Sequence, residues 1–343
     1  MSKLNLYHRP LVQQGHTRPE GAVVLAGGPL WFTHVEILSR ETCPHIMAAV
    51  DLPNEVLGRL TKPRADIAGL DMSRINLMGI LNVTPDSFSD GGKFESADVA
   101  IEHALAMIEA GADILDIGGE STRPGAAYVA PDDEIARTAP VIAALRQACA
   151  VPISIDTRKA DVAAAALKAG ATLVNDVYAF THDPDLARVT AVAGAPVCLM
   201  HAQGDPEVMQ DNPNYSDVIL DVYDFLNDRI EVAVSAGIAR DQIMIDPGIG
   251  FGKTIDHNLQ IMNRISLFHS LGCPILLGAS RKRFIGTIGK EPKADARLGG
   301  SIAVALAGAA QGVQIIRVHD IKQTKQALDL WQAVSSGEYR DVP

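Results

Sequence analysis

The chain has 343 residues, of which 47% are hydrophobic, and its mean hydropathy is +0.11. This composition predicts a large buried core and excludes a mainly disordered chain. The 41 acidic and 30 basic residues give a formal net charge of −11, which disfavours nucleic acid and anionic membrane surfaces as partners.

The cysteines are widely spaced, and no two of them form a CxxC motif: Cys43, Cys149, Cys198 and Cys273. This usage predicts reduced thiols in a reducing compartment. The longest apolar stretch near the N-terminus, residues 22–32, is interrupted by Gly27, Gly28 and Pro29 and is too short to cross a bilayer. We therefore expect a soluble, cytoplasmic protein.

Residues 1 to about 70 contain several Pro and Gly residues and only short periodic pieces, around residues 31–37 and 45–49. We predict that residues 1–70 form an N-terminal extension of unassigned function. Residues 71–343 are expected to form the main domain.

From about Ile75 onward, short runs rich in Ile, Val and Leu alternate with Ala-rich helical stretches. A Gly precedes six of these runs, where it is expected to end a helix: Gly111, Gly170, Gly194, Gly237, Gly272 and Gly312. This alternation predicts an α/β fold, a (β/α)8 TIM barrel with an N-terminal extension. A doubly wound sheet, which more often has fewer strands, is the alternative. The eight expected strands are residues 75–81, 114–117, 153–155, 173–176, 197–200, 243–245, 275–277 and 315–317.

Two long polar loops, Asn82–Phe94 and Glu120–Val129, follow the first two expected strands. Both contain Gly and Pro residues, and we expect them to be lids that exclude water from a site at the mouth of the barrel. In the first loop, Asp86 either approaches the reacting atoms or caps a turn, and both interpretations stay open.

Polar residues follow the expected strands, where barrel enzymes keep their active sites. A carboxylate can accept from two adjacent N–H groups, so Asp156, Asn175 and Asp246 suit a flat heterocycle with a guanidine-like edge. For each residue the alternative is a helix cap or a satisfied buried polar group. A second, cationic set suits phosphate: Arg281, Lys282, Arg317 and His319.

Residues 246–253, DPGIGFGK, offer glycines that allow close approach to a ligand, although an ordinary turn is the alternative. There is no nucleophile motif and no zinc-ligand cluster, and His201 with Asp205 is expected to be a polar pair. A hard cation held mainly by substrate phosphates, with Asn82 as a protein oxygen ligand, fits better, and Mg2+ is the natural candidate.

Several separated motifs resemble those of the dihydropteroate synthases, a family of pterin-binding barrels. They are MGILNVTPDSFSDGG, ADILDIGGESTRPGA, ISIDTRK, LVNDV, LMH, MIDPGIGFGK, GASRKRFIG and IRVHD. The resemblance implies a homodimeric, Mg2+-dependent transferase of folate biosynthesis and a sulfonamide target. Its reaction would condense 6-hydroxymethyl-7,8-dihydropterin pyrophosphate with p-aminobenzoate, giving 7,8-dihydropteroate and pyrophosphate.

The resemblance also implies the site residues by position. The pterin would be bound by Asp156, Asn175, Met200, Asp246 and Lys282. The pyrophosphate would be bound by Asn82, which is also the metal ligand, Arg123, Arg317 and His319. The p-aminobenzoate would be received by Thr122, Pro124, Gly250, Phe251 and Ser280. The catalytic set would be Asp86, Lys282, Arg317 and His319.

Because an aryl amine is a modest nucleophile, we expect departure of pyrophosphate to be the hard step and the displacement to be dissociative. Two other functions remain open for a pterin-binding barrel. One is a methyltetrahydrofolate-dependent corrinoid methyltransferase, and the other is a non-catalytic pterin-binding paralogue.

Overall fold

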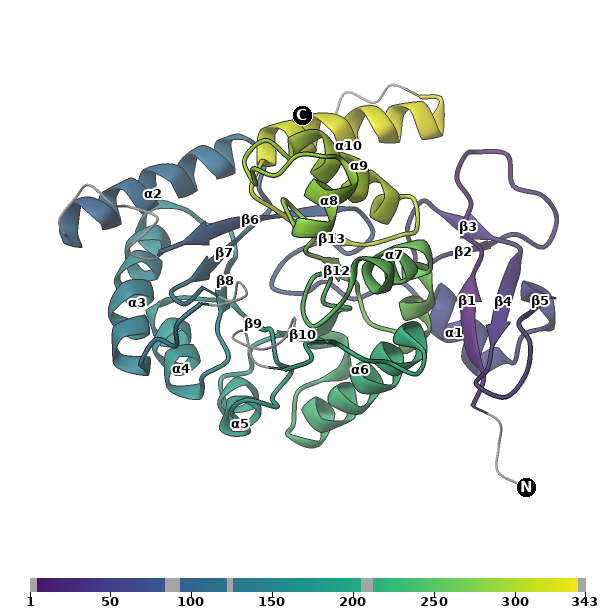
Figure 1. Ribbon diagram of the computed structural model, residues 1–343, viewed down its shortest axis with the longest axis horizontal. Helices are drawn as coiled ribbons and strands as arrows, with labels where there is room; N and C mark the ends of the chain where they lie inside the picture. Colours follow the sequence, from purple (N-terminus) through teal and green to yellow (C-terminus); the bar gives the residue numbers. More distant parts are fainter. Residues whose placement is uncertain (1–4, 84–92, 122–125, 205–211, 339–343) are drawn as a thin grey trace.

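The computed structural model describes residues 5–83, 93–121, 126–204 and 212–338. Eight parallel strands form one sheet in the order β11-β10-β9-β8-β7-β6-β13-β12 (Figure 1). A parallel bridge between Ile245 and Ile275 joins the two ends of this sheet and closes it into a barrel. The strands are β6 (Asn76–Asn82), β7 (Ile114–Gly118), β8 (Ile153–Asp156), β9 (Leu173–Asp176), β10 (Val197–Met200), β11 (Ile243–Asp246), β12 (Leu276–Leu277) and β13 (Ile315–Val318).

Helices cover the outside of the barrel, so the predicted (β/α)8 fold is confirmed (Figure 1). All six glycines at the expected helix-to-strand joints, from Gly111 to Gly312, have positive φ, as helix ends of this kind require. The helices are α2 (Lys93–Glu109), α3 (Pro131–Ala148), α4 (Ala160–Ala169), α5 (Asp185–Val192), α6 (Val218–Ser235), α7 (Ile255–Asn263), α8 (Arg283–Ile288), α9 (Leu298–Ala309) and α10 (Ile321–Ser336), with short 3-10 turns η3 (Arg240–Gln242) and η4 (Ile265–Leu271).

The N-terminal residues form a small sheet beside α6 and α7 (Figure 1). Strands β1 (Tyr7–Pro10), β4 (His34–Leu38) and β5 (His45–Ala48) pair antiparallel in the order β1-β4-β5. A second pair, β2 (Val23–Val24) and β3 (Trp31–Phe32), the turn η1 (Ala49–Asp51) and helix α1 (Asn54–Thr61) complete this N-terminal module.

The N-terminal module is fixed to the barrel by polar contacts with α6. Arg40 donates to Asp221 Oδ1 and to Asp224 Oδ2, each at 2.7 Å, and Tyr7 Oη donates to Asp224 Oδ2 at 3.0 Å. The chain then passes beneath the barrel before β6 begins. The domain boundary predicted between residues 70 and 71 stays a prediction.

The floor of the barrel is a closed apolar layer. Ile67, Leu70 and Met72, which precede β6, pack there against the first inward-facing residues of the strands. These strand residues are Met78, Ile114, Leu173, Cys198, Met244, Leu276 and Ile315. Because this end is sealed, any ligand must enter at the opposite end, where the strands finish. No helix in the described part of the chain is long and apolar enough to span a membrane.

Candidate active site

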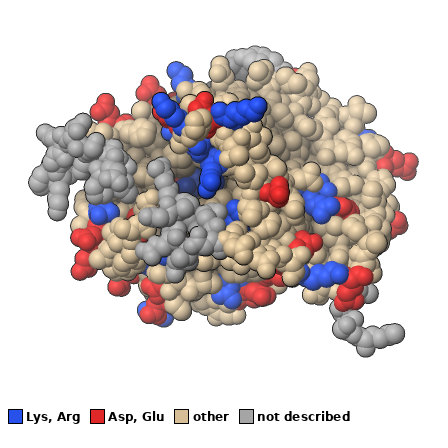
Figure 2. Space-filling view, in the orientation of Figure 1, with Lys and Arg blue, Asp and Glu red and all other residues tan. Residues whose placement is uncertain are grey.

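Inside the barrel, side chains change from apolar to polar two residues along several strands. Because alternate residues of a strand face the same side, the residue two beyond a floor residue also points inward. Ile114 is followed in this way by Asp116, and Ile315 by Arg317. The strand sequences therefore build an apolar floor and a polar mouth. Figure 2 shows Lys and Arg side chains gathered in and around a hollow near the middle of this face.

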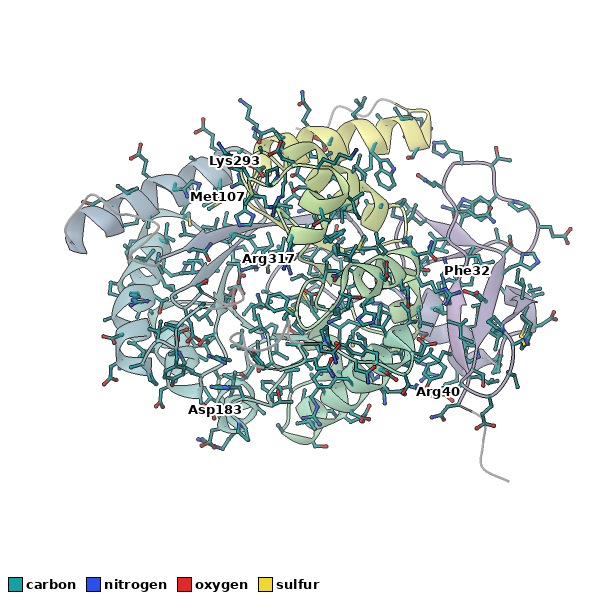
Figure 3. All side chains as sticks on the ribbon, viewed as in Figure 1. Phe32, Arg40, Met107, Asp183, Lys293 and Arg317 are labelled. Carbon is teal, nitrogen blue, oxygen red and sulfur yellow. The ribbon has the colours of Figure 1, made fainter. Side chains whose placement is uncertain are left out.

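Arg317, on β13, lies at the centre of the mouth (Figure 3). Its Nε donates to Asp116 Oδ2 at 2.6 Å and its Nη2 donates to Asp156 Oδ2 at 2.7 Å. Asp116 Oδ2 also accepts from Asn175 Nδ2 at 3.1 Å. Four side chains from four strands thus form one polar group, which we call the mouth cluster: Asp116, Asp156, Asn175 and Arg317.

In the mouth cluster, the pKa of each charged group depends on the charges of its neighbours. Burial raises the pKa of Asp156 to about 7, although Arg317 opposes the shift. Burial also opposes the charge of Arg317, but Asp116 and Asp156 hold its pKa above the ordinary value. The second oxygen of each carboxylate, Oδ1, accepts no hydrogen bond from any residue that the structure describes. Each of these two oxygens therefore has an unused capacity to accept a hydrogen bond.

A third carboxylate, Asp246 at the end of β11, stands on the other side of Arg317. Its Oδ1 accepts from the N–H of Gly248 at 2.7 Å. A Cβ added at Gly278 would lie 3.5 Å from Asp246 Oδ2 and 3.8 Å from Arg317 Cδ, so both side chains border the same glycine. Burial raises the pKa of Asp246, and the charge of Lys282 opposes this shift.

Lys282 follows β12 and carries the second cation of the mouth. Its Nζ lies 4.1 Å from the centroid of the Phe251 ring and donates to the carbonyl of Ile249. Burial lowers the pKa of Lys282 to about 7, although Asp246 opposes the shift. The charge of this amine therefore changes near neutral pH, in the same range as that of Asp156.

An apolar wall adjoins these charges. Val177, Tyr178 and Met200 form a buried cluster against which Phe251 and Ala202 pack. A wall of this kind suits the faces of flat rings. Met200 and Phe251, both predicted site residues, are thus neighbours in the structure.

Ser280 and His319 meet at the ends of β12 and β13. Ser280 Oγ lies 3.0 Å from His319 Nδ1 and accepts from the His319 backbone N–H at 3.4 Å. Arg281, by contrast, donates to both carboxylate oxygens of Asp320, through Nε at 3.0 Å and Nη2 at 2.5 Å. The charge of Arg281 is therefore paired with Asp320, and its predicted place in the phosphate-binding set stays a prediction.

The structure brings most of the predicted site residues to one mouth: Asn82, Asp156, Asn175, Met200, Asp246, Gly250, Phe251, Ser280, Lys282, Arg317 and His319. Four others lie outside the described residues, so their placement stays a prediction: Asp86, Thr122, Arg123 and Pro124. Asp205, the predicted partner of His201, also lies outside them, and the described partner of His201 Nδ1 is Lys253 Nζ, at 2.8 Å.

Asp116 is the functional candidate that reasoning from strand ends missed. It lies inside β7 rather than after it, and it is fully buried. A charged residue within an apolar strand, two positions beyond an inward-facing Ile114, is the signal that could have identified it.

Comparison with known proteins gives the family. The model of the pterin binding enzymes matches residues 78–319. Dihydropteroate synthase from Escherichia coli strain K12 is 45% identical over 269 residues, which cover 78% of this chain and 95% of that protein. The solved structure of Xanthomonas albilineans dihydropteroate synthase with 4-aminobenzoic acid is 44% identical, with a TM-score of 0.75, and covers 82% of this chain and 100% of that one.

The same Xanthomonas enzyme in complex with 7,8-dihydropteroate is 42% identical, with a TM-score of 0.72 and the same coverage of both chains. All of these named relatives are transferases of one activity, and none is a corrinoid methyltransferase. The chain therefore belongs to the pterin-binding enzyme family and, within it, to the dihydropteroate synthases.

Proposed function

We propose that the chain condenses 6-hydroxymethyl-7,8-dihydropterin pyrophosphate with p-aminobenzoate by a dissociative displacement, giving 7,8-dihydropteroate and pyrophosphate. The observation that carries the proposal is the mouth cluster, in which Arg317 bridges Asp116 and Asp156 at 2.6 and 2.7 Å. Their second carboxylate oxygens suit the N–H groups of the pterin, while the cations suit its pyrophosphate.

The carboxylates act in the proposed mechanism by binding the pterin and stabilising positive charge. Asp156 and Asp246 are both buried, so their negative charges act through a poorly screened environment when ionised. When the pterin methylene loses its bond to oxygen, the ring shares the positive charge that remains. The nearby carboxylates favour this cation and lower the barrier to its formation.

Arg317 and His319 act on the leaving group. Arg317 uses one N–H at each of two nitrogens for the carboxylates, so its remaining N–H groups can donate to departing oxygens. Ser280 fixes the ring of His319 through the 3.0 Å contact at Nδ1, which directs its other nitrogen away from Ser280. Removing a single such donor costs other enzymes about 3–4 kcal/mol of barrier lowering.

The proposed reaction has two steps. The bond between the methylene carbon and the bridging oxygen breaks, and its electron pair leaves with pyrophosphate. The amine lone pair of p-aminobenzoate then forms the C–N bond, and the nitrogen loses a proton to pyrophosphate or water. Phe251, Gly250 and Ser280 border the space in which we place p-aminobenzoate, and Thr122 and Pro124 complete this subsite in the proposal.

The residues at the mouth fit a bound Mg2+ held mainly by substrate. Asn82 and Asp156 both approach Gly118, where an added Cβ would lie 3.7 Å from Asn82 Oδ1 and 3.5 Å from Asp156 Cβ. Among the described residues, no group of three or more His, Cys, Asp or Glu side chains could hold a metal. One amide oxygen plus phosphate oxygens and water suits Mg2+. When bound, Mg2+ would neutralise charge on the pyrophosphate.

We infer further that the chain works as a homodimer in the cytoplasm. Helix α9 exposes small residues at intervals of four, Gly299, Ala303 and Ala307, which supports close packing against a second copy. All four cysteines are free thiols, which supports a reducing compartment. Sedimentation of the purified chain tests the dimer.

Product analysis tests the proposed reaction. Purified protein is incubated with both substrates and Mg2+, and we expect dihydropteroate and pyrophosphate to appear in equal amounts. A chelator should slow the reaction, and omission of p-aminobenzoate should abolish dihydropteroate. Binding of the pterin without turnover would contradict the proposal and favour a non-catalytic pterin-binding protein.

A further inference from the structure

Lys253 is a buried lysine at the mouth to which the proposed mechanism gives no role. It is only 3% exposed, and no carboxylate in the described part of the chain forms an ion pair with it. Its Nζ lies 2.8 Å from His201 Nδ1, 3.0 Å from the carbonyl oxygen of Phe251 and 3.4 Å from the carbonyl oxygen of His201. The amine therefore joins the residue after β10 to the loop after β11.

The loop between β11 and α7, residues 247–253, presses its backbone onto residues 201–203. Its three glycines all have positive φ. A Cβ added at Gly248 would lie 1.8 Å from the carbonyl oxygen of His201, and one at Gly252 would lie 2.4 Å from that of Gln203. The same added atom at Gly248 would lie 3.3 Å from Lys253 Nζ, so the amine fills the inner side of this loop.

Two further hydrogen bonds anchor the loop on either side of Phe251. The N–H of Gly250 donates to Asn258 Oδ1 at 2.7 Å, and Tyr215 Oη donates to the carbonyl of Gly252 at 2.7 Å. Between these two anchors, Lys253 holds the carbonyl of Phe251. The ring of Phe251 in turn faces Lys282 Nζ, and the preceding carbonyl of Ile249 accepts from the same amine.

We propose that Lys253 is a positioning residue, which holds the Phe251 carbonyl so that the Phe251 ring and the Ile249 carbonyl stay against Lys282 and shape the p-aminobenzoate subsite. The identity of that subsite rests on the proposed function. Desolvation of the amine lowers the pKa of Lys253 well below its ordinary range. An apolar residue of the same length would avoid this desolvation cost, so a lysine here points to a geometric role.

The first test uses Lys253→Met, which keeps the length of the side chain and removes its donors, with the exposed Lys322→Met on α10 as the matched control. In the substrate-free protein, we expect amides of residues 248–253 to exchange hydrogen at least tenfold faster in Lys253→Met, as loss of about one hydrogen bond implies. The melting temperature should not fall. Unchanged exchange in this loop would overturn the proposal.

Kinetics separate positioning from a merely structural role. We expect Lys253→Met to raise the KM for p-aminobenzoate about tenfold, while kcat and the KM for the pterin substrate change by less than about threefold. Equal losses in both KM values together with a lower melting temperature would overturn the proposal in favour of a structural role. Should Lys253→Met not fold, Lys253→Gln keeps a neutral N–H donor group and is expected to give an intermediate change in both measurements.

A double-mutant cycle tests the route through Phe251. If Lys253 acts through that ring, the effects of Lys253→Met and Phe251→Leu on the KM for p-aminobenzoate should be less than additive when combined. Additive effects would contradict this route. Hydrogen exchange needs no substrate, so it tests whether Lys253 anchors the loop even if wild-type protein forms no dihydropteroate. That second outcome would contradict only the proposed function.

Discussion

Asp156 is a carboxylate whose ionisation is harder in the folded protein than in water. Burial raises its pKa to about 7, and Arg317 offsets only part of the shift. Since the folded pKa lies above the unfolded one, proton binding stabilises the fold fully below about pH 4, and this stabilisation is lost as pH rises through about 7. In the proposed mechanism, the pterin is bound by a carboxylate whose negative charge is disfavoured by burial.

We expect Asp156→Asn to be more stable than wild type at pH 8, by at least about 1 kcal/mol, and close to wild type at pH 4. Turnover should fall at least a hundredfold, as loss of an electrostatic group at a reacting centre implies. Urea unfolding at both pH values and a rate measurement check this. A difference in unfolding free energy that is the same at both pH values would show that burial does not raise the pKa of Asp156.

Lys282 gives a second pH-dependent prediction. Since burial lowers its pKa to about 7, the cation is lost as pH rises through that value, just as Asp156 becomes ionised. We expect kcat/KM to be bell-shaped around neutral pH, with apparent pKa values that belong to the coupled groups. In Lys282→Arg the guanidinium stays charged, so the alkaline fall should disappear or move up by more than about one pH unit. An unchanged alkaline limb would assign it to another group.

Several site residues could be predicted from the sequence because they stand where strands end. Asp156, Asn175 and Asp246 follow apolar runs directly, and the structure brings them to one mouth. Asp116 could not be found by that rule, because it faces inward from within β7. Arg281 could not be separated from its neighbour Lys282, since only the fold brings Asp320 within 2.5 Å of its guanidinium.

At the scale of elements, the loop after β11 requires glycine at position 248 more strictly than the end of α5 requires it at position 194. Gly248 has φ of +69°, and an added Cβ would meet the carbonyl oxygen of His201 at 1.8 Å. Gly194, after α5, has a similar φ of +64° but nothing within 4 Å of the added atom. Substitution at Gly194 would therefore cause backbone strain alone, whereas substitution at Gly248 would cause backbone strain and a steric clash.

We expect Gly194→Ala to cost about 1 kcal/mol of unfolding free energy, from left-handed backbone alone. Gly248→Ala should cost at least about 3 kcal/mol, because either β10 or the loop must move as well. Urea unfolding of both variants checks this. Equal losses would mean that the loop after β11 can shift away from His201 freely.

The strands of the barrel were predictable because each is an apolar run with a polar end, and six of them follow a glycine joint. Both ends of all eight strands agree with the prediction within one residue. The pairing of strands in the N-terminal module was not predictable, because β2 and β3 have only two residues each and β1 pairs with β4 across a long separation in sequence. Strands of two residues are too short to show an alternating pattern of apolar and polar residues, and pairing between distant segments has no local sequence signal.

For the whole molecule, the residues that stabilise the fold and the residues proposed to act in the reaction lie at opposite ends of the barrel. The floor is apolar and includes Met72 at 1% exposure, whereas the mouth holds the charges. We expect Met72→Ala to cost about 2–5 kcal/mol of unfolding free energy through the cavity it leaves. Both kcat and KM should stay within about twofold of wild type, since the site lies at the other end.

Leu330→Ala, at a position 65% exposed on α10, is the control for Met72→Ala and should leave stability nearly unchanged. Thermal unfolding and steady-state kinetics of both variants check the separation. A tenfold loss of turnover in Met72→Ala, measured well below its melting temperature, would mean that the floor and the mouth are coupled.

The most direct measurement is the initial rate of 7,8-dihydropteroate formation for wild type and for Asp246→Asn. The amide keeps an oxygen for the N–H of Gly248 but removes a buried negative charge beside Arg317. The account predicts dihydropteroate and pyrophosphate in equal amounts from wild type, and a rate at least a hundredfold lower from the variant. Wild-type protein without dihydropteroate, or a variant as fast as wild type, would contradict it.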